Sequence, residues 1–218
     1  MQLYSTMGGS MNKRVLVFLC IAIILSLVII FTQYISTNDK VTMKEVNLED
    51  LNELIIGSEP PKLLYADKDK VIFDCYGVFV YDMKAKMISQ SFDVLSIDSD
   101  KNEKRKWNSF VSQDGKHIIF RIGKSANNDF VDWYCYSFED DLVTEIDEKA
   151  YLNYRNSAFE WTDLDYNDEL YEKSSGRIVP ISDSEYVYLT FQDWLVSTIQ
   201  VIYVKDNKET YYRIFDNY

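Results

Sequence analysis

The chain has 218 residues and a formal net charge of -12, from 35 acidic and 23 basic residues. This excess of negative charge disfavours binding to nucleic acid and to anionic lipid surfaces, because both repel an acidic protein. The 3 cysteines form no CxxC pair, and their spacing to the 1 histidine does not indicate a zinc site. Nucleic-acid partners and zinc chemistry are therefore the first classes that the composition excludes.

The first predicted element is an uncharged apolar run, Val15–Phe31, which extends to residue 35. A helix of about 20 residues is about 30 Å long and satisfies its own backbone hydrogen bonds in lipid. Residues 15–35 are therefore predicted to form a transmembrane helix. The run is longer than the apolar core of a signal peptide and ends without an A-x-A-like cleavage site, which favours an uncleaved anchor.

The charges on the two sides of this run predict its orientation. Lys13 and Arg14 precede it, whereas the charges just after it cancel. The positive-inside rule places residues 1–14 in the cytoplasm and the chain after the helix outside the cell membrane. Met1 and Met11 both remain candidates for the true start, since a bacterial membrane protein more usually begins like the segment from Met11.

Residues 36–61 are expected to link the anchor to a folded domain. Within them, residues 47–57 carry apolar side chains at positions that share one helical face. Asn47 can cap such a helix, Gly57 can end it, and the paired prolines that follow prevent its continuation. The sequence therefore predicts a polar stalk followed by a short docking helix.

Residues 62–218 have the composition of a β-sheet domain. β-branched and aromatic residues occur in short runs bounded by Asp, Asn, Lys and Gly, which is typical of antiparallel strands. The predicted strands are 63–65, 71–73, 78–82, 87–94, 117–122, 130–138, 142–146, 186–191, 198–204 and 209–215, with weaker ones at 158–161 and 177–180.

These strands recur in units that share an order of turn, apolar strand, loop, aromatic strand, turn and outer strand. In one unit, Asp114-Gly115 supplies the positive φ angle of a hairpin turn. With a weaker unit over Tyr151–Ile181, the domain holds about four units of about 40 residues each. The predicted fold class is all-β, with propeller-like antiparallel blades, about four of them or an incomplete propeller. A twisted antiparallel sheet is the alternative.

A candidate metal site lies in the acidic segment 163–169. Asp163, Asp165 and Asn167 match the first three ligand positions of a calcium loop. The match then fails, because Asp168 stands where the loop needs Gly and Ser174 stands where it needs Glu. Calcium is the only cofactor expected, and a solvated acidic loop is the alternative.

Cys75 and Cys135 both lie in the part expected outside the cell, where a disulfide is permitted. Both also lie in apolar, strand-like surroundings, so buried free thiols are the alternative. His117 begins a predicted strand and is interpreted as structural. No G-x-S-x-G elbow accompanies it, and so no catalytic residue is predicted.

Four tryptophans, Trp107, Trp133, Trp161 and Trp194, fall about once per predicted unit. One aromatic residue per blade is typical of packing between neighbouring sheets. An aromatic face that stacks on sugars or peptides is the alternative.

Two segments resemble known families. Ser112–Phe120 resembles the blade-opening repeat of TolB-type propellers, with Gln113 in place of the usual proline. Residues 62–82 are similar to the bladed extracytoplasmic region of clostridial BlaR-like β-lactam sensors. Those proteins carry a zinc peptidase domain, whereas this chain has no H-E-x-x-H motif, so no active-site residue carries over. The resemblance implies an exported, membrane-tethered sensing domain of a Gram-positive bacterium.

The sequence therefore predicts a single-pass membrane protein whose residues 62–218 form an extracytoplasmic sensor or binding module. Its expected ligand is a protein, a peptide or a cell-wall component, and it is not expected to be an enzyme. Two alternatives stay open. One is an exported hydrolase that uses the acidic segment, and the other is a remnant of a larger sensor that lost its peptidase half.

Overall fold

A computed structural model of the chain describes residues 23, 26, 43–51, 54–57, 60–97, 105–124, 130–165 and 168–215. The chain divides into two compact units, Met1–Lys40 and Val41–Tyr218. Apart from Ile23 and Ser26, the predicted anchor and cytoplasmic segment lie outside the described residues. Among the residues that are described, no helix is long and apolar enough to cross a membrane.

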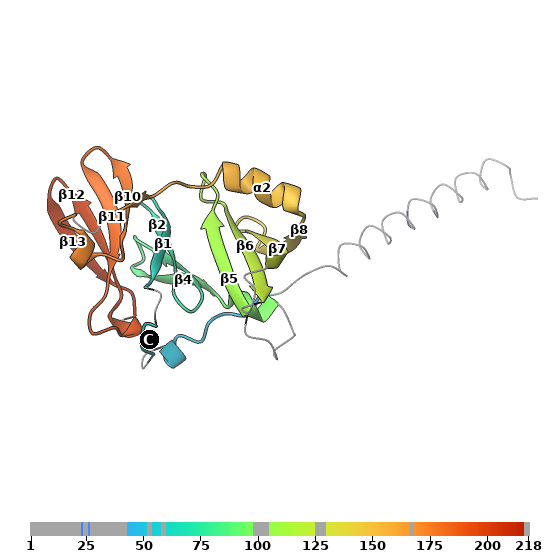
Figure 1. Ribbon diagram of the computed structural model, residues 1–218, viewed down its shortest axis with the longest axis horizontal. Coiled ribbons are helices and arrows are strands. Elements are labelled where there is room, and N and C mark those ends of the chain that lie inside the picture. The colour runs from blue at the N-terminus through green and yellow to red at the C-terminus, as the bar shows by residue number, and fades with distance from the viewer. Residues whose placement is uncertain are drawn as a thin grey trace, which may run out of the picture. The chain divides into compact units, whose positions relative to one another are not determined.

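The described part of the second unit contains three antiparallel sheets (Figure 1). The first sheet has the order β1 (Lys62–Ala66), β2 (Lys70–Asp74), β3 (Val78–Asp82) and β4 (Met87–Phe92). The second has the order β5 (Arg105–Val111), β6 (His117–Lys124), β7 (Phe130–Ser137) and β8 (Leu142–Ile146). The third has the order β13 (Lys208–Arg213), β12 (Gln200–Lys205), β11 (Glu185–Thr190), β10 (Arg177–Ser182) and β9 (Thr162–Asp163). The all-β class is thus confirmed.

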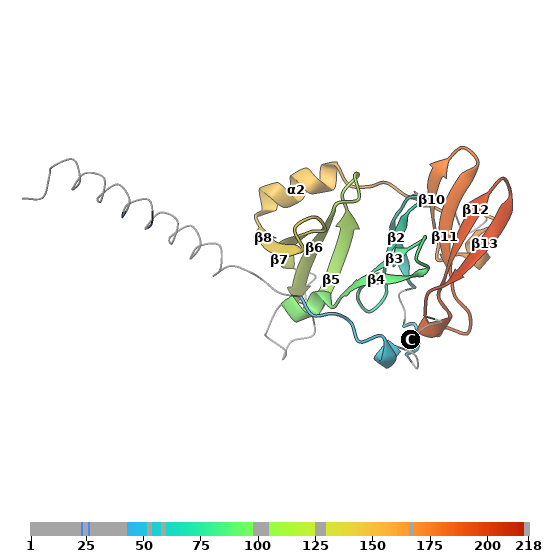
Figure 2. The same cartoon turned by 180° about the vertical axis from the view of Figure 1, so that it is seen from behind.

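One α-helix and four short 3-10 helices complete the described structure. They are α2 (Glu148–Asn156), η1 (Glu49–Leu51), η2 (Val94–Ile97), η3 (Tyr171–Lys173) and η4 (Val196–Thr198). Figure 2 shows α2 beside the second sheet. Its residue Tyr151 packs its ring 5.6 Å from that of Phe110 in β5, so the helix covers one face of this sheet.

Aspartate side chains shape the hairpin turns. The Oδ1 atom of Asp67 accepts hydrogen bonds from the backbone N–H groups of Asp69 and Lys70 at 2.7 and 2.8 Å. Asp82 and Asp114 make similar contacts in their own turns. These local bonds mimic a backbone turn, which is why Asp ends so many strands in this sequence.

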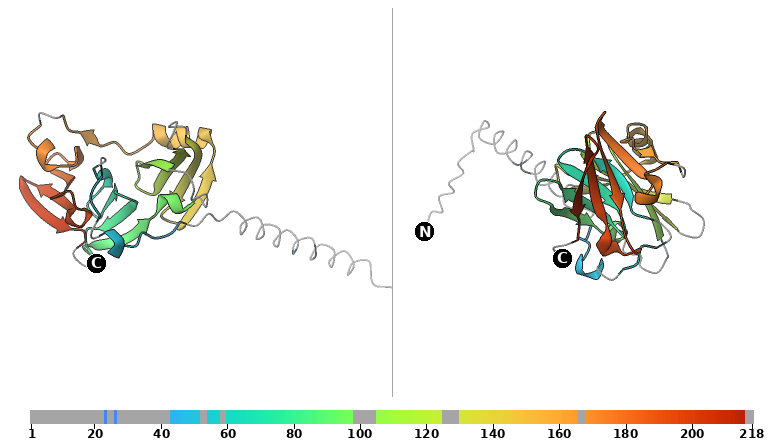
Figure 3. Two further views of the ribbon diagram at one scale, coloured as in Figure 1. Left: turned by 60° about the horizontal axis from the view of Figure 1, so that its bottom comes forward. Right: turned by 90° about the vertical axis from the view of Figure 1, so that its left-hand side faces the viewer.

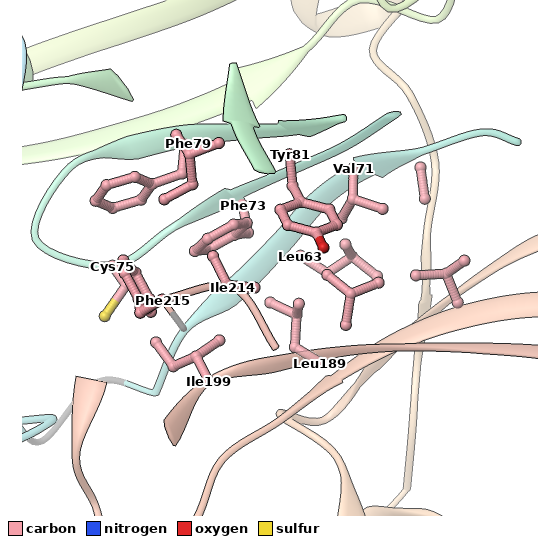
Figure 4. Packing of buried hydrophobic residues seen from close by; sticks show 14 of the residues in the cluster. Leu63, Val71, Phe73, Cys75, Phe79, Tyr81, Leu189, Ile199, Ile214 and Phe215 are labelled. Atoms are coloured by element: carbon pink, nitrogen blue, oxygen red, sulfur yellow. The ribbon is translucent and has the colours of Figure 1, made fainter. Parts of the chain in front are cut away.

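The first sheet lies between the other two and is buried on both faces (Figure 3). Alternate residues of β2 face opposite sides: Val71 and Phe73 join a cluster with the third sheet, whereas Ile72 joins a cluster with the second. In Figure 4, Phe73 and other first-sheet side chains point toward Leu189 and Ile199. A strand buried on both faces needs no polar side, which explains the unbroken apolar runs of β1 to β3.

The fourth unit expected over residues 151–181 is wrong, because this stretch forms no sheet of its own. Its first part belongs to α2. The Asp147 side chain caps the N-terminus of this helix, since its Oδ1 accepts a hydrogen bond from Ala150 N–H at 2.7 Å. The predicted strand 158–161 is replaced by a single bridge between Ala158 and Ser112. The predicted strand 177–180 is part of β10, whose backbone pairs with β11 in the third sheet.

The docking helix expected over residues 47–57 is also wrong beyond its first turn. Asn47 does cap that turn, since its Oδ1 accepts from Glu49 N–H at 3.3 Å. After η1, however, Ile55 forms a β-bridge with Leu195. Pairing with the third-sheet region satisfies the backbone there, so the helix does not continue.

Candidate functional site

Asp163 is the first predicted calcium ligand. In the structure its carboxylate accepts hydrogen bonds from two side chains. Its Oδ1 accepts hydrogen bonds from Arg177 Nε and Trp161 Nε1, each at 3.2 Å. Asp165 is exposed, and its N–H donates to Asp168 at 2.6 Å. Asn167 lies outside the described residues. No group of three or more possible metal ligands occurs among the residues that the structure does describe. The calcium site therefore stays a prediction.

Cys75 and Cys135 are both buried and free. Cys75 belongs to the cluster between the first and third sheets, whereas Cys135 belongs to the cluster between the second sheet and α2. The structure thus shows the free-thiol alternative rather than the possible disulfide. Burial raises the pKa of both thiols.

The turn at Ser112–Lys116 of the second sheet packs against the first sheet. A Cβ at Gly115 would lie 2.5 Å from the ring of Tyr65 in β1, so only glycine fits there. Lys70 Nζ donates to the Gly115 carbonyl at 2.6 Å. His117 is half-buried with its ring 5.7 Å from that of Tyr154. These contacts support the structural interpretation of His117.

A cavity of about 280 Å³ opens where β1 and β2 of the first sheet come close to β5 of the second. Its walls come from the segment before β1, from the paired strand ends and from one indole: Gly57, Pro60, Lys62, Asp74, Cys75, Tyr76 and Trp107. The antiparallel register pairs Lys62 with Asp74, which places a cation and an anion at the same level of the sheet.

Asp74 is the carboxyl group of this cavity, and its pKa is shifted. Burial raises the pKa of its carboxyl from 3.8 to about 6, because a buried charge loses solvation. Lys62 and Arg177, together with a hydrogen bond from Ser109 Oγ at 3.3 Å, hold the pKa down against that effect. The group is therefore mostly ionised at pH 7.5 and mostly protonated at pH 5.

Two aromatic side chains border the carboxyl. Trp107 comes from the second sheet and is half-buried. Tyr76 is 52% exposed, and its backbone is left-handed with a φ of 59°. The Tyr76 hydroxyl donates to the Ile55 carbonyl at 2.6 Å, which fixes the ring at the rim.

Cys75 also lines the cavity, but it is a poor nucleophile there. Burial and the neighbouring Asp74 raise the pKa of its thiol to about 12. The thiolate is the reactive form of cysteine, and almost none exists at neutral pH with such a pKa. The cavity thus joins one desolvated carboxylate, one cation and two aromatic rings, a set suited to holding a charged polar group.

Sequence reasoning missed Asp74 because it stands at the end of a strand, where most aspartates of this chain belong to turns. One pattern could have marked it. Asp74 is followed by Cys75-Tyr76-Gly77 rather than by the Asp, Asn or Lys residues of the other turns. The packing of β5 against this strand end, which creates the cavity, cannot be read from either segment alone.

No family model, curated protein or solved structure shows detectable similarity to this chain. The resemblances to TolB-type propellers and BlaR-like sensors therefore stay predictions, and function has to be argued from the site itself.

Proposed function

We propose that this protein is a membrane-anchored, extracytoplasmic sensor or binding module. Its three sheets act as the blades of an incomplete propeller, and the Asp74 cavity between them receives a cationic group of a peptide or cell-wall ligand. The anchor is residues 15–35 and the binding domain is residues 62–218. Signalling across the membrane would run through a partner protein.

The observation that carries the proposal is the desolvated Asp74 carboxyl in a cavity with aromatic walls. A buried carboxylate is costly unless a cation pairs with it. A protonated amine that binds in the cavity would stabilise the Asp74 carboxylate, because its charge replaces the solvation that the carboxylate lost on burial. The faces of Trp107 and Tyr76 attract the same cation through their π electrons.

The lining favours binding over catalysis. Hydrolysis of glycosides generally needs two carboxylates, and Asp74 is the one carboxylate among the described residues that line the cavity. The Cys75 thiol, with its raised pKa, gives no ready nucleophile. The hydrolase alternative relied on the acidic segment, where Asp163 is engaged by Arg177 and Trp161.

A thermal melt of residues 41–218 tests the proposal, because this segment is a compact unit that contains the core clusters. The probes are short cationic peptides and amine-bearing cell-wall fragments, each paired with its N-acetylated, uncharged counterpart. A ligand that binds only the folded protein raises the melting midpoint. We expect a rise with an amine-bearing probe at pH 7.5, a smaller rise at pH 5, and none with its acetylated form.

Two variants locate the binding site. Asp74→Asn is expected to remove the rise, whereas Asp163→Asn, which neutralises an exposed carboxylate elsewhere, is expected to keep it. An equal rise in wild type and Asp74→Asn would contradict the proposed site. The absence of a rise with every amine-bearing probe would contradict the proposed ligand chemistry.

Membrane attachment is tested separately. The full chain is expected in the membrane fraction of bacterial cells, with residues 62–218 open to protease added outside. A variant without residues 15–35 is expected in the soluble fraction. Recovery of the full chain in the soluble fraction would contradict the anchor.

A further inference from the structure

A second cavity, distinct from that of Asp74, lies beside an exposed tryptophan. It measures about 250 Å³ and is lined by Lys173, Ser174, Thr190, Phe191, Asp193 and Trp194. The Trp194 side chain is 55% exposed. Single exposed aromatic residues are common, and what distinguishes Trp194 is the cavity that it lines.

The backbone beneath this ring is strained. Gln192 to Leu195 form a turn in which the Gln192 carbonyl accepts from Leu195 N–H at 3.1 Å. Its two central residues, Asp193 and Trp194, have φ angles of 53° and 56°. This is the pattern of a type I′ turn, where Asn and Gly are strongly preferred and a bulky residue is disfavoured.

Hydrogen bonds on both sides hold the turn in this conformation. Ile56 N–H donates to the Trp194 carbonyl at 2.6 Å, and Val196 N–H donates to the Leu54 carbonyl at 3.0 Å. The Thr198 hydroxyl donates a hydrogen bond to the Gln192 carbonyl at 2.5 Å. Strained backbone that the surroundings maintain in this way is characteristic of ligand sites.

The cavity wall has the chemistry of a sugar site. Phe191 supports the indole, with ring centroids 5.3 Å apart and a tilt of 58°. The negative face of an indole attracts the polarised C–H groups of a pyranose ring. Around it stand an amine, two hydroxyls and a carboxylate, on Lys173, Thr190, Ser174 and Asp193, which can bond sugar hydroxyls.

We propose that the Trp194 cavity is a carbohydrate-binding subsite that stacks one sugar ring of a glycan on the indole. Its volume lies below the range for drug-sized ligands, and one ring or a group of similar size matches it. This site does not depend on the Asp74 cavity, and the two can be tested independently on the same protein.

The test uses the full chain in detergent and isothermal titration calorimetry. The probes are the β-1,4-linked tetramer of N-acetylglucosamine, cellotetraose and tetralysine. We expect binding of at least one of the two oligosaccharides by wild type, and an affinity at least about tenfold lower in Trp194→Ala. The matched control is Tyr211→Ala, an exposed aromatic residue of β13, which is expected to bind as wild type does.

A further variant separates binding from folding. Trp194→Gly places the residue that a left-handed turn favours, so its melting midpoint is expected to equal or exceed that of wild type while sugar binding is lost. Three results would overturn the subsite: no oligosaccharide binding at millimolar concentration, wild-type sugar affinity in Trp194→Gly and Trp194→Ala, or tetralysine as the probe that needs Trp194. Asp74→Asn is expected to leave the oligosaccharide affinity unchanged, and an equal loss in that variant would also count against a separate site.

Discussion

Two aspartates of this protein show how differently similar residues can behave. Asp163 lies in a dense acidic segment, is 74% exposed and accepts hydrogen bonds from Arg177 and Trp161. Asp74 stands alone at the end of an apolar strand and has a pKa raised to about 6 by burial. The acidic segment that the sequence marked as a candidate site is thus solvated, and its Asp163 is paired with Arg177. The carboxyl with the shifted pKa is that of Asp74, which the sequence did not mark.

The reason lies in solvation. Many neighbouring acidic residues repel one another and remain in water, where each charge is screened and interacts weakly. A single carboxylate in an apolar setting can be buried by packing from another part of the chain, and burial is what shifts a pKa by two units or more. Four predictions test this difference, in decreasing order of expected effect.

Asp74→Asn is expected to stabilise the protein at neutral pH. The folded-state pKa of about 6 lies above the usual 3.8, so the folded state holds its proton more tightly. The contribution of Asp74 to stability is therefore present below pH 3.8 and is lost as the pH rises through 6. The loss at pH 7 amounts to up to about 3 kcal/mol, which the neutral amide would recover in part. Urea denaturation at pH 7 and pH 4 checks this, and a variant less stable than wild type at pH 7 would contradict it.

Arg177→Ala is expected to cost about 1–3 kcal/mol of unfolding free energy. The guanidinium lies 4.0 Å from the Trp161 ring centroid, bonds Asp163 and donates to the Leu63 carbonyl at 3.4 Å. Its loss should also raise the pKa of Asp74 further, since Arg177 holds that pKa down. Arg155→Ala, an exposed arginine in α2, is the control in the same urea series and should lie within about 0.5 kcal/mol of wild type.

Asp163→Asn is expected to cost no more than about 1 kcal/mol, because its ion pair with Arg177 is largely solvent-exposed on the Asp163 side. Salt screens such pairs, so the small difference from wild type should shrink further in 1 M NaCl. A cost that is large and independent of salt would show that Asp163 is as strongly coupled to the fold as Asp74 is.

Calcium at millimolar concentration is expected to leave the melting midpoint of wild type unchanged. The Asp163 carboxylate already serves Arg177 and Trp161, and a calcium ion would have to compete with both. A midpoint that rises with calcium in wild type but not in Asp163→Asn would restore the metal site predicted from the sequence.

Much of the fold could be predicted because local chemistry decides it. Strands Val78–Asp82 and Leu142–Ile146 were predicted with the bounds that the structure shows. Apolar runs between Asp-containing turns leave little choice for such segments. Strand β5, Arg105–Val111, was not predicted, since charged and polar residues interrupt its pattern and its pairing with β6 alone defines it.

The remaining differences arise from contacts between distant segments. Residues 177–180 do form a strand, but their partner is β11, so the expected fourth unit joins the third sheet. The candidate site has the same origin. Trp107 of β5 lines the cavity beside Asp74 at the end of β2, and Ser109 of β5 donates a hydrogen bond to its carboxylate. No pattern within either segment encodes that contact.

The most direct test of the account is a carbon-13 NMR titration of the Asp74 carboxyl, assigned with Asp74→Asn, with and without a saturating amine-bearing ligand from the melt series. The account predicts a pKa near 6 in the free protein and a lower value in the complex, because a bound cation stabilises the carboxylate. A pKa near 3.8 in the free protein, or the same pKa with and without ligand, would contradict the claim that the half-buried Asp74 is the binding carboxylate.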